Sequence, residues 1–289
     1  MRPSLQSRLL ARAMTIMRAR EQFNPKKFTA EPSAPRRYSP PQSIRKTVNV
    51  TQNTFRGWPV FEVTPSAPSG KRALYLHGGA WAAEIQAGHW NLIADLAVRT
   101  SRTFVVPIFP LVPTVTHRDI TPTLVELWAK TAADSPTALV GDSSGATTAL
   151  NLLVALPNGS PSPDATVLLS PTFDLTFSNP QSARIAPHDP LLRLEYIRAL
   201  AKSYAGPDGP DSGLVSPVNA RVDRLGAITV FTGTRDLLNP DAHRYADLAR
   251  DAGGTTVTIE ETDGMVHDWM LMPIPEAKTT RARIAGVLQ

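Results

Sequence analysis

The stretch TALVGDSSGATTAL, residues 137–150, decides how the fold of this chain is interpreted. Its first residues have the composition of a buried strand, and the residues after position 145 have that of a helix. Between them, residues 141–145 match the pattern G-x-S-x-G. The two glycines permit a very tight turn from strand to helix, and this turn holds its middle residue exposed at the start of the helix. The pattern therefore predicts that this middle residue, Ser143, is a nucleophile.

Short apolar runs alternate with helical patterns on both sides of this stretch. The runs that predict further strands are 73–76, 103–109, 165–170, 227–231 and 255–261. Two alternating runs around Gly57 predict a hairpin ahead of them. Because parallel strands need crossover connections, the alternation predicts a mostly parallel sheet flanked by helices. We expect residues 1–289 to form a single α/β domain.

Two segments lie outside this alternation. Residues 178–225 form a long insertion with a predicted helix, and loops of such length inside a domain tend to cover a functional site. Residues 1–46 carry 11 of the 30 basic residues and only 2 of the 25 acidic ones. The positive charge is therefore local, the rest of the chain is slightly acidic, and nucleic-acid binding is not predicted.

The basic arm contains an amphipathic pattern. Leu5, Leu9, Ala13, Ile16 and Met17 recur at helical spacing with arginines between them. Such a helix either packs against its own domain or lies on a membrane surface, and we favour packing, with weak membrane-surface contact as the alternative. No apolar run approaches the roughly 20 residues of a membrane-spanning helix.

The absence of cysteine narrows the chemistry. It excludes disulfides, a thiolate nucleophile and cysteine-ligated metals, and it fits a cytoplasmic location. The six histidines show no zinc-binding spacing, and the glycine motifs that bind phosphates are missing. Neither a metal nor a cofactor is predicted.

A serine nucleophile needs a base to accept its proton and a carboxylate to orient that base. In this type of sheet the acid and the histidine follow the serine, each just past a late strand. Asp236 and His267 occupy those two places. Asp241 is the alternative acid, but Asp236 follows its strand more closely. Asp268 and Glu261 are expected to be solvated.

The negative oxygen of a tetrahedral intermediate needs N–H donors. The strand at 73–76 runs into His77-Gly78-Gly79-Ala80, whose flexible backbone can direct its amides at the serine. The amide of Ser144, at the start of a helix, is the expected second donor. The side chain of Ser144 is expected to be incidental.

Six motifs occur in a fixed order along the chain: HGGAW (77–81), GDSSGA (141–146), LLSPTFDL (168–175), DPLL (189–192), GTRDLL (233–238) and VHDW (266–269). Together they resemble the α/β-hydrolases of the hormone-sensitive-lipase-like esterase family. The resemblance implies a helical cap built from about 1–46 and 178–225. It also implies that Ser143 is the nucleophile, Asp236 the orienting acid and His267 the base. The implied oxyanion hole consists of Gly78, Gly79, Ala80 and Ser144.

Two positions depart from the family pattern. Ala80 stands where the family usually has a third glycine, and because alanine keeps its N–H we expect activity to survive. Residues 106–120 lack the family's tyrosine-arginine and proline-glutamate signature, and the sequence offers no account of the replacement.

The resemblance implies a serine carboxylesterase that acts through an acyl-enzyme on small short- to medium-chain esters. A lactone, carbamate or formamide hydrolase with the same triad is an alternative. A non-catalytic small-molecule receptor on the same fold is an alternative of another class. The sequence does not give the natural substrate or the oligomeric state, and a homo-oligomer is compatible with it.

Overall fold

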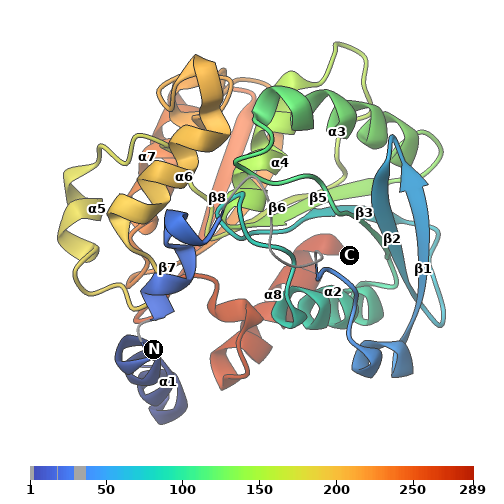
Figure 1. The fold of residues 1–289 in the computed structure, drawn as a ribbon. Coiled ribbons are helices and arrows are strands. Elements are labelled where there is room, and N and C mark those ends of the chain that lie inside the picture. Colours follow the sequence, from blue (N-terminus) through green and yellow to red (C-terminus); the bar gives the residue numbers. More distant parts are fainter. Residues whose placement is uncertain (1–2, 18, 29–36) are drawn as a thin grey trace.

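One sheet of eight strands runs through the residues described by the computed structural model, which are 3–17, 19–28 and 37–289. The spatial order is β1-β2-β4-β3-β5-β6-β7-β8 (Figure 1). The strands are β1 Val48–Phe55, β2 Trp58–Pro65, β3 Arg72–Leu76, β4 Thr103–Pro107, β5 Thr137–Asp142, β6 Thr166–Leu169, β7 Gly226–Gly233 and β8 Thr255–Thr262. β1, β2 and β4 pair antiparallel, and all other neighbours pair in parallel. This confirms the predicted fold class and the hairpin around Gly57.

Helices cover both faces of this sheet. The α-helices are α1 Leu5–Ile16, α2 Ala87–Thr100, α3 His117–Thr131, α4 Ser144–Ala155, α5 Pro180–Ile185, α6 Leu194–Ala205, α7 Asn239–Ala252 and α8 Pro275–Leu288. Successive strand residues point to opposite faces. Leu139 packs in the core with α3, α4 and α7, while Ala138 and Val140 pack in the core with α2 and α8. The two cores hold the carboxyl ends of the parallel strands at one edge.

Helix α3 begins at His117, directly after a capping residue. The side chain of Thr116 accepts a hydrogen bond from the Arg118 amide, and the carboxylate of Asp119 accepts one from the Thr116 amide. This reciprocal capping satisfies amides at the helix start that have no partner inside the helix.

The basic arm lies against the insertion. Within the arm, α1 is followed by the short 3-10 helices η1 Ala19–Phe23, η2 Pro25–Lys27 and η3 Gln42–Lys46. The insertion contains η4 Gly206–Asp208 and η5 Pro217–Asn219, and η6 Trp269–Leu271 lies before α8. The guanidinium of Arg20 donates hydrogen bonds to three backbone carbonyls of the insertion, those of Ala186, Pro187 and Asp189. Glu21 forms an ion pair of 2.9 Å with Arg193. The two segments expected to cover the site are therefore in contact with each other.

Helix α1 packs on its own domain, as favoured from the sequence, but through a different face. Its buried residues are Ser7 and Ala11, and the hydroxyl of Ser7 donates to Glu276 of α8. The apolar stripe quoted above instead leaves Leu5 and Ile16 exposed. Among the described residues, no helix combines the length and apolar character needed to cross a membrane.

Candidate active site

Ser143 lies on a sharp turn between β5 and α4, with φ 50° and ψ −124°. Two glycines make this turn possible. A Cβ atom at Gly145 would lie 2.1 Å from the carbonyl oxygen of Leu76, and one at Gly141 would lie 2.6 Å from the carbonyl oxygen of Gly145. Left-handed backbone at a serine costs of the order of 1–3 kcal/mol, so the surrounding packing must hold it in place.

The structure brings Ser143, Asp236 and His267 into contact. The Nε2 atom of His267 lies 2.9 Å from the Ser143 hydroxyl, and its Nδ1 atom lies 2.8 Å from a carboxylate oxygen of Asp236. Asp236 follows β7, and its other oxygen accepts the Leu238 amide at 2.9 Å. All three side chains are buried. The three residues that the sequence predicted as nucleophile, acid and base, which follow β5, β7 and β8, therefore lie together.

Asp268 was expected to be solvated, and that expectation is wrong. Its backbone has φ 50°, which turns the side chain inward, and one carboxylate oxygen lies 3.2 Å from His267 Nε2. Its amide donates to the Ser170 hydroxyl at 3.1 Å. The other carboxylate oxygen is buried without a hydrogen-bond partner among the described residues. Two carboxylates therefore face one imidazole, from Asp236 and from Asp268.

These carboxylates control the proton affinity of the imidazole. Burial alone would lower the pKa of His267, but the charges of Asp236 and Asp268 outweigh it and raise this pKa well above its ordinary value. Burial also raises the pKa of Asp268 to about 6. The imidazolium form of His267 is thus strongly favoured by its surroundings.

The two other acidic candidates lie elsewhere. Asp241, the alternative acid, lies in the first turn of α7 and accepts a hydrogen bond of 2.9 Å from the side chain of Asn179. Glu261 was expected to be solvated; it is partly exposed but is bound by His243 and Asn239 at 2.8 Å each. Neither carboxylate has a hydrogen bond to His267 within the described part of the chain.

The loop after β3 brings backbone amides beside Ser143. Gly79 and Ala80 have φ of 123° and 53°, and their amides form no hydrogen bond within the described residues. The amide of Ser144 is in the first turn of α4, where amides lack partners inside the helix. The Gly78 amide differs, because it donates to the carboxylate of Asp142 at 3.0 Å. Of the four predicted donors, Gly78 is therefore already engaged.

Sequence reasoning missed the part played by Asp142, which stands next to Ser143 in the quoted stretch. Its buried carboxylate accepts the Tyr75 hydroxyl at 2.5 Å and lies 3.1 Å from Nε2 of His89. Burial alone would raise the pKa of Asp142, but His89 and Tyr75 lower it below the ordinary value. An ionised carboxylate thus fixes the loop that contains Gly78. The only sequence signal was a charged residue inside a motif of small ones.

The side chain of Ser144 is not incidental, contrary to expectation. Its hydroxyl accepts a hydrogen bond of 3.1 Å from the amide of Trp81. Trp81 has φ 57° and stacks on Tyr204 of α6 with ring centroids 4.6 Å apart. The far end of the amide loop is therefore tied both to the serine turn and to the insertion.

The buried carboxylate of Asp189, in the DPLL motif, joins the insertion to the Asp236 loop. One oxygen accepts the amides of Leu191 and Leu192 at 2.8 and 2.9 Å, and the other accepts the Leu237 amide at 3.0 Å. Burial and the nearby charge of Asp236 raise the pKa of Asp189 to about 6. The motif was quoted in the sequence analysis, but no role had been assigned to it.

A small apolar cavity adjoins the Ser143 hydroxyl. Its lining comes from the arm, the amide loop, the serine turn, the segment after β6, the insertion and the Asp236 loop. These residues are Phe23, Ala80, Trp81, Ser143, Ser144, Thr172, Phe177, Leu192, Ile197 and Leu238. The volume open to the centre of a water molecule is about 10 Å³, roughly the space of one water. A larger acyl group therefore requires the lining side chains to move.

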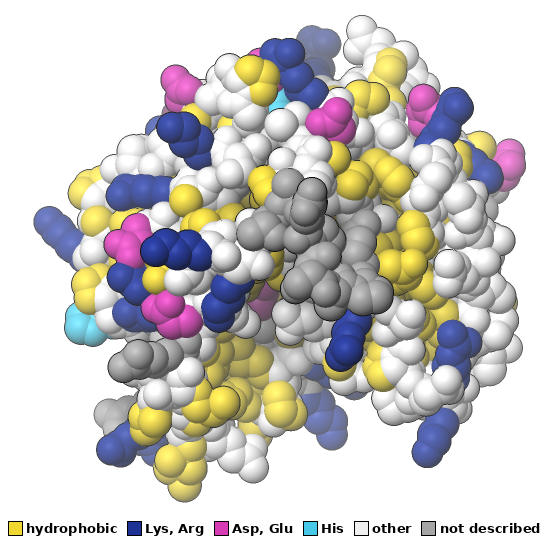
Figure 2. Space-filling view, viewed as in Figure 1, with side chains coloured by type: hydrophobic (Ala, Val, Ile, Leu, Met, Phe, Trp, Pro, Cys, Tyr) yellow, Lys and Arg dark blue, Asp and Glu magenta, His cyan; other side chains and the backbone are white. Residues whose placement is uncertain are grey.

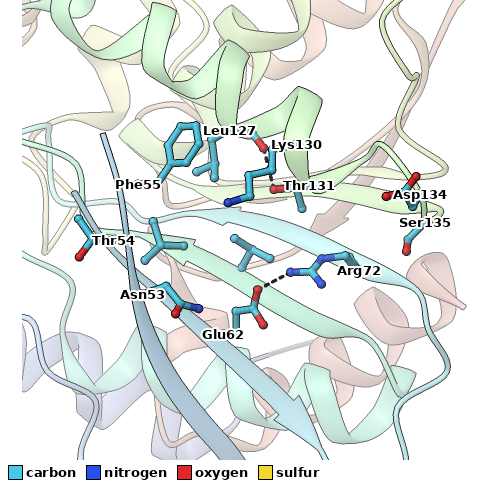
Figure 3. A pocket seen from close by; sticks show the side chains of 12 residues that line it. Asn53, Thr54, Phe55, Glu62, Arg72, Leu127, Lys130, Thr131, Asp134 and Ser135 are labelled. Carbon is cyan, nitrogen blue, oxygen red and sulfur yellow. Dashed lines mark hydrogen bonds and ion pairs between the residues drawn. The ribbon is translucent and has the colours of Figure 1, made fainter. Parts of the chain in front are cut away.

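A roomier cavity of about 270 Å³ lies at the other end of the parallel strands (Figure 3). Figure 3 shows Glu62 and Arg72 paired across its wall, at 2.6 Å, with Lys130 nearby. The ammonium of Lys130 lies 5.4 Å from the ring centre of Phe55. The lining of this cavity contains no histidine among the described residues. Within the described residues, no cluster of three or more histidine, aspartate or glutamate side chains is placed to hold a metal ion.

The chain was compared with known proteins. Residues 73–271 match a family model described as the alpha/beta hydrolase fold. The chain is 28% identical over 243 residues to a triacylglycerol lipase of Mycobacterium tuberculosis, covering 81% of this chain and 50% of the lipase. It is 29% identical to an acetyl-hydrolase of Streptomyces hygroscopicus, covering 72% of this chain and 71% of that protein. The chain thus spans about half the length of the lipase that it matches.

Among solved structures, one similar fold is that of an esterase from the bacterial hormone-sensitive lipase family. The TM-score is 0.83 at 24% identity, with 100% of this chain and 98% of the other covered. At this identity the likeness establishes a shared fold.

Proposed function

The chain belongs to the α/β-hydrolase fold family, as the resemblance of its motifs to the hormone-sensitive-lipase-like esterases indicated, and we propose that it is a serine carboxylesterase. The observation that carries this proposal is the pair of contacts at His267, one to the Ser143 hydroxyl at 2.9 Å and one to Asp236 at 2.8 Å. The names of the relatives, an acetyl-hydrolase and a triacylglycerol lipase, agree with acyl-ester chemistry.

The reaction has two covalent steps. His267 Nε2 accepts the proton of Ser143 as the hydroxyl oxygen attacks the ester carbonyl, and a tetrahedral intermediate forms. The amides of Gly79, Ala80 and Ser144 hold its negative oxygen. The imidazolium then gives its proton to the leaving alcohol, and the acyl group stays on the serine. Water repeats the sequence and releases the acid.

The surroundings of His267 suit this cycle. In the catalytic cycle, His267 becomes an imidazolium as the tetrahedral intermediate forms, and the carboxylates of Asp236 and Asp268 stabilise that charged state. The same charges favour the imidazolium before substrate binds, so the free base becomes available only as pH rises. We therefore propose that activity increases with pH across the titration of His267.

We also propose that residues 1–46 and 178–225 form a cap over the site. Phe23 of the arm and Phe177 with Leu192 and Ile197 of the insertion side line the cavity beside Ser143. Because that cavity has room for about one water, short acyl groups should fit with the least rearrangement. Among short- to medium-chain esters, kcat/KM should therefore be highest for acetyl and propionyl esters and fall with chain length.

Labelling with a fluorophosphonate probe, read by intact mass and peptide mapping, tests the proposal. The probe should modify the parent protein at Ser143. It should fail to modify Ser143→Ala, while Ser144→Ala, the neighbouring serine, should still react. No labelling and no ester turnover would instead favour the non-catalytic receptor.

A substrate panel then defines the acyl donor. Esters of increasing chain length, a lactone, an aryl carbamate and a formamide are compared by kcat/KM on the parent protein. Esters should give the highest values. If the lactone, carbamate or formamide exceeded all esters while Ser143 was still labelled, the triad assignment would stand and the esterase assignment would fail.

A further inference from the structure

Helix α1 presents an unusual outer face to solvent. The described residues include seven large hydrophobic side chains that are exposed, and four of them are Leu5, Leu9, Ile16 and Met17, at 62%, 56%, 72% and 79% exposure. Figure 2 shows this apolar surface in the region that α1 occupies in Figure 1. Single exposed hydrophobic residues are ordinary, but a concentration of them on one short element indicates a contact surface.

The inner face of α1 is firmly attached to the domain. The Ser4 amide and the Ser7 hydroxyl donate to the carboxylate of Glu276 on α8, at 2.6 and 2.5 Å. Ser7 and Ala11 are buried against the segment 264–274, which also contains His267, and the cavity left between them has room for only about one water. The exposed side chains therefore belong to a helix with fixed orientation, and they point away from the protein.

The charged residues of α1 itself are both positive. At 100° per residue, Leu5, Leu9 and Ile16 fall within a stripe about 40° wide, and Arg8 and Arg12 lie along one edge of it. Both arginines are exposed and form no ion pair among the described residues. Helix α1 contains no acidic residue. Apolar side chains edged by arginines are the pattern of a helix that lies in the headgroup region of an anionic membrane.

We propose that the outer face of α1 (Leu5, Arg8, Leu9, Arg12 and Ile16) binds the surface of a bilayer that contains anionic phospholipid. The helix lies flat, its apolar stripe enters the boundary between headgroups and acyl chains, and its arginines pair with lipid phosphates. The surface is separate from the Ser143 chemistry, so the proposal does not depend on the esterase assignment.

Flotation of the full-length protein with vesicles tests this proposal. One set of vesicles is phosphatidylcholine, and the other contains roughly one third phosphatidylglycerol, a composition that gives a strongly negative surface. The parent protein and the Ser143→Ala variant should both float with the anionic vesicles and much less with the neutral ones. Equal binding to both sets, or binding to neither, would overturn the proposal.

Substitutions separate the apolar and charged contributions. The triple variant Leu5→Ser, Leu9→Ser, Ile16→Ser should weaken partitioning by at least about tenfold. Arg8→Gln with Arg12→Gln should abolish the preference for anionic vesicles. The matched control is Val98→Ser with Leu214→Ser, which removes exposed apolar side chains at 51% and 60% exposure elsewhere and should bind as the parent does.

The main competing occupant is a second copy of the chain. Light scattering after size exclusion, without lipid, measures the oligomeric state of the parent and the triple variant, and circular dichroism checks that each is folded. A parent dimer that the triple substitution converts to monomer, together with no vesicle binding, would assign the face to self-association and overturn the lipid proposal.

Discussion

The two ends of the parallel strands hold very different sites. At the carboxyl ends, the cavity beside Ser143 is nearly filled, while its backbone is strained and its carboxylates are buried. At the amino ends, the lining of the cavity of about 270 Å³ includes the ion pair of Glu62 and Arg72, which is about one third exposed. The described residues that line the roomier cavity include no histidine to act as the base of a serine nucleophile. Strain and buried charge therefore mark the end that we propose as reactive, whereas open volume marks the other end.

The largest effect should come from removing the nucleophile. Ser143→Ala should lower kcat for ester hydrolysis by about 10⁴–10⁶-fold, as loss of a triad serine does. Alanine meets the same left-handed backbone as serine, so the free energy of unfolding should change little. Steady-state kinetics and urea unfolding measure the two effects. Near-parent turnover by a folded variant would show that the chemistry lies elsewhere, and the comparison of the two ends would fail.

The second effect concerns the carboxylate that holds the amide loop. Asp142→Asn leaves the Gly78 amide and Tyr75 competing for one acceptor oxygen and removes the charge that faces His89. We expect kcat to fall by about 10–100-fold with KM nearly unchanged, because the loop amides act on the transition state. Tyr75→Phe is the matched control and should cost less. A loss confined to KM, or to stability, would contradict a positioning role.

The third effect is a change in pH dependence. Asp268→Asn removes one of the two negative charges that favour protonated His267. The pKa of His267 should fall, and the acidic limb of the kcat/KM profile should move to lower pH. Asp263→Asn, on the same loop but exposed, is the control and should leave the limb in place. An acidic limb whose apparent pKa was unchanged or higher in Asp268→Asn would contradict this account.

The smallest effect is expected at the opposite end of the strands. Glu62→Gln breaks the ion pair with Arg72, and a pair that is about one third exposed contributes less than about 1 kcal/mol to stability. We expect kcat/KM to stay within about twofold of the parent. Chemical unfolding and ester kinetics test this. A tenfold loss of activity would mean that the two ends are energetically coupled.

The sequence was most informative where local backbone geometry determines position. A strand followed by a glycine-flanked serine requires one particular turn, and the ends of parallel strands meet at one edge. The contacts of His267 with Ser143 and Asp236 could therefore be predicted. Asp268 could not, because the direction of its side chain depends on a left-handed backbone at an ordinary residue. The serine hydroxyl at 144 was missed because its partner, the Trp81 amide, is remote in sequence.

Helix α1 illustrates a second limit of sequence reasoning. Its periodic apolar residues predicted a buried face, but the helix docks through Ser7 and Ala11, whose small side chains permit close approach and a hydrogen bond to Glu276. Hydrophobic periodicity identifies the helix and its two faces. Periodicity does not identify whether the apolar face of a helix packs against its own domain or faces outward.

The left-handed backbone at Ser143 has an evolutionary consequence. Glycine adopts φ near 50° without the penalty of about 1–3 kcal/mol that serine incurs there. Variants selected only for survival at high temperature should therefore accumulate glycine at position 143 and lose turnover. Directed evolution toward a more thermostable enzyme therefore has to screen for product in every round, because selection for thermostability alone favours the inactive protein.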